Sequence, residues 1–417
     1  MDQMKLLQQR WADMPQPRKI KALRVVVFVC YSLALLFFVI YAFGGTTKRV
    51  SEPMPVVLFM ESMPGGIMAL RYLAKRADVF IAMIVLATDA WNVNLNAAYD
   101  NTAAFIAMMR KEGVLLYDIP IYYGNSVAQA NARFDEDVSF TSINVSHNTT
   151  SCTYRRVLDP NVLLDADRLF GASDLLDGVP ISAPRNNSDG STLSGQMEFF
   201  DVPLLHYLTR HTASFLVLGP STDAAWFLQQ HPDQRSRVSL VIMAGGVMGA
   251  DGDTRLVYPP NRRSELHMFF DPHAANYLVS GAHGRQVLLL LLDAAPKWPA
   301  PLYESLIVAR ASSSAATSAN VVAHAVSGFN RRFAAELPLP VEVATAAYFA
   351  DLHIRGGVTV TEVPLLVANG VAMATDGMLG TPADVHKQPT GLKVKAVLKL
   401  QEGTFWSRFE RVDRLTL

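Results

Sequence analysis

Short runs of consecutive apolar residues alternate with helical patterns along the chain from residue 55 onward. The apolar runs are 56–60, 79–87, 114–123, 215–219, 238–243 and 287–292, and the helical patterns between them include 97–111, 223–230 and 272–280. A strand that is apolar at successive positions is buried on both faces, which is typical of a parallel sheet covered by helices. The pattern therefore predicts an α/β fold with a mostly parallel central sheet flanked by helices. Ligands of such a fold bind at the carboxyl ends of the strands.

The C-terminal part and two polar stretches complete the predicted domain. Runs at 358–363 and 392–400 have a strand-like pattern and predict strands added at one edge of the sheet. Residues 125–171 and 184–196 are richer in Asn, Ser, Asp and Gly than their surroundings, so we expect them to be surface insertions. Residues 55–417 should then form one domain.

The first part of the chain differs from the rest. Residues 25–43 include no charged residue, and at about 1.5 Å per helical residue they are long enough to cross a bilayer core of roughly 30 Å. More basic residues precede this segment than follow it, which predicts a cytoplasmic tail at 1–24, a transmembrane signal anchor at 25–43 and a linker at 44–54. The protein would be a type II single-pass membrane protein whose body is lumenal or extracellular. A cleavable signal peptide is the alternative, although its apolar core usually spans about 7 to 15 residues.

Three glycosylation sequons are compatible with this orientation, because glycosylation requires an accessible loop on the translocated side of the membrane. They begin at Asn144, Asn148 and Asn186. Such triplets also arise by chance. The two cysteines, Cys30 and Cys152, form no recognisable disulfide framework, and Cys152 would be either buried or paired with another chain.

Composition narrows the function classes. Half of the 417 residues are apolar, which is enough for a large core. Lys and Arg total 37 and Asp and Glu total 37, so no net charge favours a nucleic-acid partner. The sequence also has no Cys/His cluster with zinc spacing, no Walker loop and no G-x-S-x-G motif.

Six segments together carry a family resemblance. They are VVLFMESMPGGIMAL at 56–70, ATDAWN at 87–92, IPIYYG at 119–124, LGPSTDAA at 218–225, IMAGG at 242–246 and SELHMFFDPHAA at 264–275. In the same order they resemble the D-x-D-P-G-x-D-D-A opening, the T-x-x-G-N turn, the I-P-V-x-x-G strand, and the L-G-P-L-T-N-L-A, M-G-G and A-E-F-N-x-x-x-D-P-x-A-A segments of the inosine-uridine preferring nucleoside hydrolase family. The resemblance extends to about residue 292 and implies the fold of that family.

The resemblance also implies a chemistry whose residues are mostly replaced here. The family hydrolyses the N-glycosidic bond of ribonucleosides with a calcium ion, which needs about six to eight oxygen ligands, and with an aspartate as general base. In the opening motif the first Asp is matched by Glu61, the second by Met63, and the adjacent pair by Ile67 and Met68. Met and Ile offer no oxygen, so we expect no cofactor, and calcium is not expected to bind as it does in the family.

The distal part of the family site is altered too. Its His-Asp pair best matches Glu342 and Val343, which would remove another carboxylate and the histidine that serves the leaving group. Glu61 is either a residual catalytic base or a structural carboxylate at a strand end. Asp271, which precedes Pro272, is predicted to cap the next helix.

Four residues are candidates for substrate binding. Asn92 and Glu265 match ribose contacts of the family, His267 replaces an Asn, and Asp89 lies on the same turn as Asn92. Each also has a structural interpretation: Asn92 can bond the backbone of its turn, Glu265 can begin a strand, and His267 can be a packed or hydrogen-bonded core residue.

Three functions are compatible with these residues. The first is a tethered pseudoenzyme that binds a nucleoside-like ligand or a protein partner. The second is an active N-ribohydrolase with a metal-free site. The third is a structural role in a homo- or hetero-oligomer, since members of the family commonly form dimers or tetramers. Fold similarity alone does not decide between them.

Overall fold

The computed structural model describes residues 15–17, 21, 24, 27–28, 31, 52–87, 95–125, 198–249, 251–256, 260–315, 317–332, 340–368, 375–381 and 393–414. The chain divides into two compact units, Met1–Glu52 and Pro53–Leu417. In the first unit the described residues after Pro15 are helical and exposed. Across the described parts of the chain, no helix has both the length and the apolar character needed to span a membrane. Most of the predicted anchor, 25–43, lies outside the described residues, so it stays a prediction.

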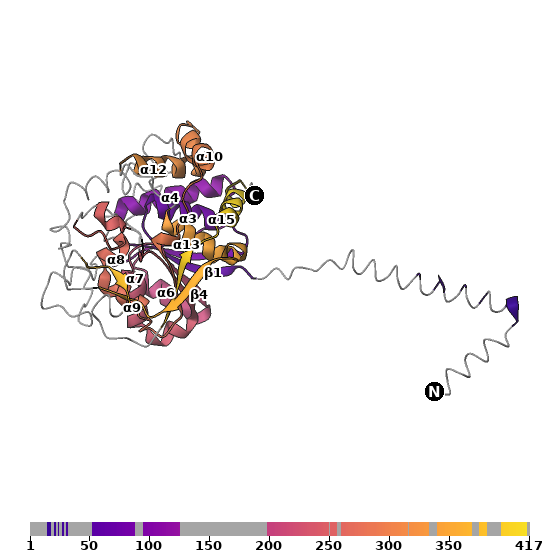
Figure 1. Ribbon diagram of the computed structural model, residues 1–417, viewed down its shortest axis with the longest axis horizontal. Coiled ribbons are helices and arrows are strands. Elements are labelled where there is room, and N and C mark those ends of the chain that lie inside the picture. Colours follow the sequence, from indigo (N-terminus) through magenta and orange to yellow (C-terminus); the bar gives the residue numbers. More distant parts are fainter. Residues whose placement is uncertain are drawn as a thin grey trace, which may run out of the picture. The chain divides into compact units, whose positions relative to one another are not determined.

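An eight-stranded sheet forms the centre of the second unit (Figure 1). Its strands, in spatial order, are β3 (Ile121–Tyr123), β2 (Val79–Leu86), β1 (Met54–Met60), β4 (Ala213–Val217), β5 (Val238–Ala244), β6 (Val287–Leu290), β10 (Val394–Lys399) and β7 (Thr359–Val363). All neighbours are parallel except β7, which pairs antiparallel with β10. A separate antiparallel pair joins β8 (Leu366–Val367) to β9 (Leu379–Gly380). The predicted mostly parallel sheet is confirmed.

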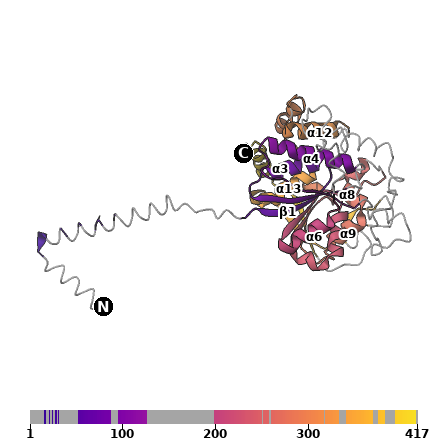
Figure 2. The ribbon, with the colours of Figure 1, turned by 180° about the vertical axis from the view of Figure 1, so that it is seen from behind.

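Helices cover both faces of this sheet (Figures 1 and 2). One face carries α3 (Pro64–Ala74), α4 (Leu95–Lys111), α12 (Ser318–Arg332), α13 (Val341–Ala350) and α15 (Glu402–Arg414), and the other carries α6 (Asp201–Arg210), α7 (Thr222–Gln230) and α9 (Pro272–Val279). The shorter helices are α8 (Leu266–Phe270), α10 (Ala300–Tyr303), α11 (Ala309–Ala311) and α14 (Leu352–Arg355), with 3-10 segments at Pro232–Arg237, Asp253–Leu256 and Leu292–Ala294 and a π-helical turn at Glu304–Val308.

The strand β1 shows why its sequence is apolar without interruption. Val56, Leu58 and Met60 pack into the core on the α3 side, and Val57 and Phe59 into the core on the α7 side. Side chains alternate across a strand, so a strand between two helical layers needs apolar residues at every position. The same rule accounts for the other central strands.

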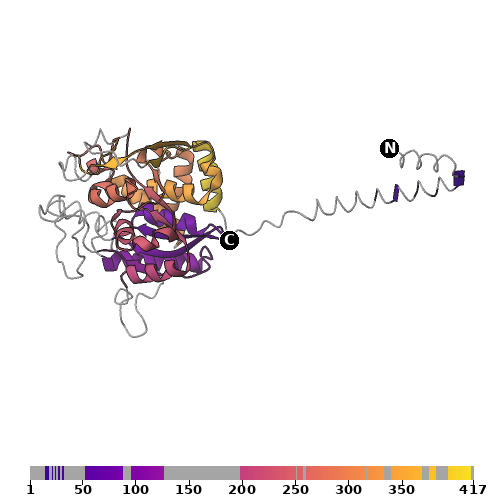
Figure 3. The same ribbon diagram turned by 90° about the horizontal axis from the view of Figure 1, so that it is seen from below.

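The predicted strands differ from the observed ones mainly at 114–123, where only Ile121–Tyr123 is extended. Gly113 has φ of 72° and ends α4, and the amide of Val114 donates back to the carbonyl of Met109. A glycine with positive φ is a common helix terminator, after which apolar residues pack against the last turn. The apolar character of this segment therefore reflects a helix end, and the prediction of a longer strand was wrong. The two C-terminal runs were predicted correctly, since β10 and β7 lie at one edge of the sheet, as the colour order in Figure 3 also shows.

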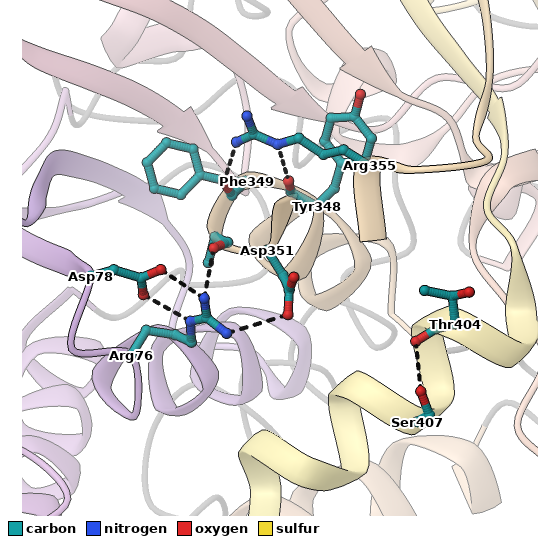
Figure 4. Close-up of polar contacts among 9 residues, drawn as sticks. Arg76, Asp78, Tyr348, Phe349, Asp351, Arg355, Thr404 and Ser407 are labelled. Atoms are coloured by element: carbon teal, nitrogen blue, oxygen red, sulfur yellow. Dashed lines mark hydrogen bonds and ion pairs between the residues drawn. The ribbon is translucent and has the colours of Figure 1, made fainter. Parts of the chain in front are cut away.

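The helix α13 is held rigidly by arginines at its C-terminal end (Figure 4). Arg76 donates to Asp78 at 2.7 and 2.9 Å, to Asp351 at 3.3 Å and to the carbonyl of Ala350 at 3.0 Å. Arg355 donates to the carbonyls of Tyr348, at 2.8 Å, and Phe349. Cations at a helix C-terminus satisfy its unpaired carbonyls and complement its dipole. The other end of α13 carries Glu342.

Candidate functional site

A cleft of about 390 Å³ opens at the carboxyl ends of β1, β5 and β6. The acids Glu61, Asp253, Glu265 and Glu342 and the side chain of His267 lie along one part of its wall. Lys297, Phe329 and Asn330 line another part. This position agrees with the expectation that ligands of an open α/β fold bind beyond the carboxyl ends of its strands.

The turn between β1 and α3 forms the floor of the cleft. Glu61 follows the last residue of β1 and is 1 % exposed, and Met63 occupies the N-cap position of α3. A Cβ on Gly66 would lie 2.4 Å from the carbonyl oxygen of Glu61, so the close approach of helix and strand requires glycine there. Ile67 is fully buried inside α3, where its amide donates to the carbonyl of Met63. The resemblance places the family's general base at Ile67 or its neighbours, and Ile67 is part of the apolar core.

The residue Glu265 caps a helix and does not begin a strand, which corrects the sequence-based expectation. Its carboxylate accepts hydrogen bonds from the amides of His267 at 2.9 Å and Met268 at 3.1 Å, at the start of α8. A Cβ on Gly245 would lie 2.5 Å from Glu265 Oε2, and Gly245 itself has φ of 122°. The glycine after β5 thus makes room for this carboxylate at the strand end. Asp271 caps α9 through the amide of Ala274 at 3.0 Å, as predicted.

The side chain of His267 joins two of the acids. Its Nε2 lies 3.2 Å from Glu61 Oε2, and its Nδ1 lies 3.1 Å from Glu265 Oε1. All three side chains are buried. Burial works against the charged imidazole, but the attraction of Glu265 and of Glu61 outweighs it and raises the pKa of His267 well above its ordinary value. The same contact, against the opposing effect of burial, lowers the pKa of Glu265.

Two further carboxyl groups approach this trio from other elements. Asp253 accepts a hydrogen bond from the amide of Leu266 at 2.8 Å, and burial together with the nearby Glu265 raises its pKa to about 7. Burial also raises the pKa of Glu342. The Glu342 carboxylate lies over the first turn of α3, because a Cβ on Gly65 would come within 2.5 Å of its Oε2. Carboxyl groups with raised pKa in a cleft are candidates for proton donors or ligand contacts.

The structure brings together three of the five residues selected from the sequence: Glu61, Glu265 and His267. Asp89 and Asn92 lie outside the described residues. So do the sequons at Asn144, Asn148 and Asn186, the two cysteines and all but one residue of the predicted insertions.

Sequence analysis missed Asp253, Lys297 and Asn330 as part of the site, because they belong to no motif and reach the cleft only through the fold. Sequence analysis treated Glu342 only as the replacement of the family's histidine, whereas its side chain lines the cleft.

Solved structures of the same fold are nucleoside hydrolases. The chain resembles a plant nucleoside hydrolase with a TM-score of 0.60 and 16 % identity, covering 87 % of this chain and 100 % of that one. It resembles the inosine-uridine preferring nucleoside hydrolase of Bacillus anthracis with a TM-score of 0.59 and 14 % identity, covering 86 % and 98 %. It resembles the purine-preferring ribonucleoside hydrolase of Gardnerella vaginalis with a TM-score of 0.59 and 13 % identity, covering 86 % of this chain and 97 % of that one. At these identities the likeness establishes the fold.

The sequence profile of the inosine-uridine preferring nucleoside hydrolases matches residues 64–407. The chain therefore belongs to that family. No curated protein matches it.

The residues of the cleft do not fit the calcium ion that the family implies. Met63 and Ile67 contribute a thioether and a hydrocarbon, whereas calcium takes about six to eight oxygen ligands. Two carboxylates of the cleft, Glu61 and Glu265, face His267. Within the part of the chain that the structure describes, no group of three or more His, Cys, Asp or Glu side chains has the arrangement of a metal site.

Proposed function

We propose that this domain binds a nucleoside-like small molecule in the cleft without hydrolysing it. The observation that carries the proposal is that a cleft opens beyond the carboxyl ends of the strands, while Met63 and Ile67 stand where the resemblance expects the residues that hold the metal and activate water. Binding and catalysis have different requirements, and these two replacements affect catalysis.

The cleft has the size and the lining of a small-molecule site. Its volume of about 390 Å³ lies within the roughly 300–1,000 Å³ that is usual for ligand pockets. Apolar surface from Met63, Leu292 and Phe329 adjoins polar groups such as Asn330. Such pockets combine apolar contact area with a few polar groups that orient the ligand. The similar solved structures include an inosine-uridine preferring nucleoside hydrolase and a purine-preferring ribonucleoside hydrolase, which supports a ligand of that class.

Hydrolysis lacks its means of activating water. A positioned general base contributes about 10² to 10⁴ in rate, and Ile67 has no group that takes a proton. Glu61 and Glu265 could serve as bases only by giving up contacts with His267, and both are almost completely buried. Their arrangement supports a structural role at the floor of the cleft.

Direct binding measurements test this function. The purified full-length protein is titrated with inosine, uridine, adenosine and cytidine by calorimetry, and release of ribose is assayed with the same protein with and without calcium. We expect binding of at least one nucleoside, weaker binding by Glu265→Gln and no release of ribose. Glu362→Gln, a change on the exposed edge strand β7, should bind like the wild type. Calcium-dependent release of ribose, or no binding by folded protein, would overturn the proposal.

A second candidate function rests on the raised pKa of Glu342. A carboxyl group whose pKa is raised by burial holds its proton to a higher pH than an exposed one and could protonate the departing base of an N-glycoside. This function predicts metal-independent release of ribose that Glu342→Gln abolishes. If neither the wild type nor the variant releases ribose, the candidate fails.

We also propose that residues 25–43 anchor the chain and that its body lies on the lumenal or extracellular side. The proposal rests on the apolar segment and the distribution of basic residues around it. Treatment with a glycosidase should shift the mobility of the cellular protein, and substitution of Asn144, Asn148 and Asn186 by Gln should remove that shift. Digestion of the body by protease added on the cytoplasmic side of sealed vesicles would contradict this topology.

A further inference from the structure

The buried cation His267 is surrounded by acids from four separate segments of the fold. Glu61 comes from the end of β1, Glu265 from the residue before α8, Asp253 from the preceding 3-10 segment and Glu342 from the start of α13. Glu61 and Glu265 contact the imidazole directly, at 3.2 and 3.1 Å. The others lie close enough for their charges to interact with His267. Like charges in such a space repel, and an opposite charge among them offsets the repulsion.

The surroundings of His267 favour the form that carries both of its ring protons. A neutral imidazole has one N–H, so one of its nitrogens would face a carboxylate with a lone pair. Here each nitrogen faces a different carboxylate oxygen. Nε2 lies within hydrogen-bond distance of Glu61, whereas Nδ1 is at ion-pair distance from Glu265 without the geometry of a hydrogen bond. The charged form puts no lone pair of the ring against either carboxylate. Glu61 and Glu265 are 1 % exposed, so little water reaches them to act as the donor instead.

We propose that His267 is a built-in cation that takes the place of the family's calcium ion, holding the carboxylates of the strand ends in a metal-independent binding site. The cleft lacks the oxygen ligands that calcium needs because, on this proposal, the positive charge comes from His267. The family motif has Asn where this chain has His267, and an Asn could not neutralise Glu61 and Glu265. The loss of oxygen ligands at Met63 and Ile67 and the gain of a cation at His267 are two parts of one change.

This inference concerns the same cleft as the proposed function. It depends on the proposed function only in assuming that the cleft binds a nucleoside-like ligand. A site with its own cation should bind its nucleoside-like ligand equally well in calcium and in a chelator. The cation itself is tested separately, through stability, because a ligand that binds only the native state stabilises it.

The first experiment measures thermal unfolding of the full-length wild type and of His267→Asn, in EDTA and over a series of calcium concentrations. The Tm of the wild type should be the same in all conditions. His267→Asn, which removes the cation between two buried acids, should melt lower than the wild type in every condition. His206→Asn, a change on the exposed side of α6, should behave like the wild type. A Tm of the wild type that rises with calcium would overturn the proposal, and so would a folded His267→Asn whose Tm equals that of the wild type.

A second variant keeps the test decisive if His267→Asn does not fold. Glu61→Gln combined with His267→Asn removes one acid together with the cation, so the double variant should fold and melt above the single one. Failure of the double variant to recover any stability would contradict the charge balance on which the proposal depends. Nucleoside titration of the wild type in EDTA separates the two proposals: no binding in any condition rejects the proposed function alone, and binding that appears only with calcium rejects the built-in cation.

Discussion

Two charged clusters lie at opposite ends of the helix α3, and their signs are reversed. At its N-terminal end, Glu61 and Glu265 face the imidazole of His267. At its C-terminal end, Arg71 of α3, the capping residue Lys75 and Arg310 of α11 face Asp413 of α15, with Arg71 and Arg310 at 2.5 and 2.7 Å from its carboxylate. Lys75 donates to the carbonyl of the same residue at 2.5 Å.

The surroundings of the two clusters explain their different roles. The space beside Asp413 is about 20 Å³, close to the minimum that one water molecule needs, and Tyr72 stacks on Phe409 beside it with ring centroids 5.6 Å apart. The space beside His267 is a cleft of about 390 Å³. A closed cluster can only hold elements together, and here it attaches α15 to the body of the domain. The cluster around His267 faces a cleft large enough to admit a small molecule.

The largest effect is expected at the closed cluster. Asp413→Ala leaves Arg71, Lys75 and Arg310 facing one another without their acid, and loss of one partner of a buried ion pair typically costs about 3–5 kcal/mol. Denaturant unfolding of the full-length protein measures the loss. Glu410→Ala on the same helix removes an exposed pair with Arg414 and should cost at most about 1 kcal/mol. Equal effects of the two substitutions would mean that the Asp413 cluster does not fasten α15.

Much of this fold follows from the sequence, because burial on two faces leaves a local signal. Val56, Phe59 and their neighbours are apolar without interruption since both sides of β1 meet helices. The failure at 114–123 has the opposite cause: the end of α4 uses Gly113 and then apolar residues, and a short apolar run does not distinguish a helix end from a strand.

The site was less predictable, because it is built from segments distant in sequence. The resemblance located Glu61, Glu265 and His267. No local pattern shows that His267 contacts both Glu265, two residues before it, and Glu61, 206 residues before it. Asp253 belongs to no motif and enters the cleft through a 3-10 turn. Charge balance among such residues is a property of the folded chain, so a residue-by-residue match to a family cannot reveal it.

A smaller effect, on the pH dependence of stability, is expected from Asp253 in the cluster around His267. The pKa of Asp253 is raised from its ordinary 3.8 to about 7. Between these values the native state keeps a proton that the unfolded state has lost, so stability is highest at the acid end of this window and falls as pH rises, by up to about 1.4 kcal/mol per pH unit. Asp253→Asn keeps the acceptor for the amide of Leu266 but cannot ionise.

Thermal unfolding at several pH values across this window measures the difference. The variant should lose less stability than the wild type as pH rises from 4 towards 7. Asp251→Asn is the matched control, because Asp251 is exposed and lies two residues away. Parallel curves for Asp253→Asn and the wild type would show that Asp253 ionises alike in the native and unfolded states.

The smallest effect on stability is expected from Gly65→Ala, although it changes the cluster around His267 directly. The new Cβ would lie 2.5 Å from Glu342 Oε2, so the carboxylate must move, and the end of a flexible side chain moves at little cost. Alanine also favours the helix over glycine by up to about 1 kcal/mol. Gly328→Ala in α12, where nothing lies within 4 Å of the added Cβ, is the control for that helix effect alone. Both variants should melt close to the wild type, while only Gly65→Ala should weaken nucleoside binding, by about tenfold for each 1.4 kcal/mol of lost contact. Unchanged affinity in Gly65→Ala would place Glu342 outside the ligand's contacts, and recognition would then have to come from other lining residues of the cleft, such as Lys297 and Asn330.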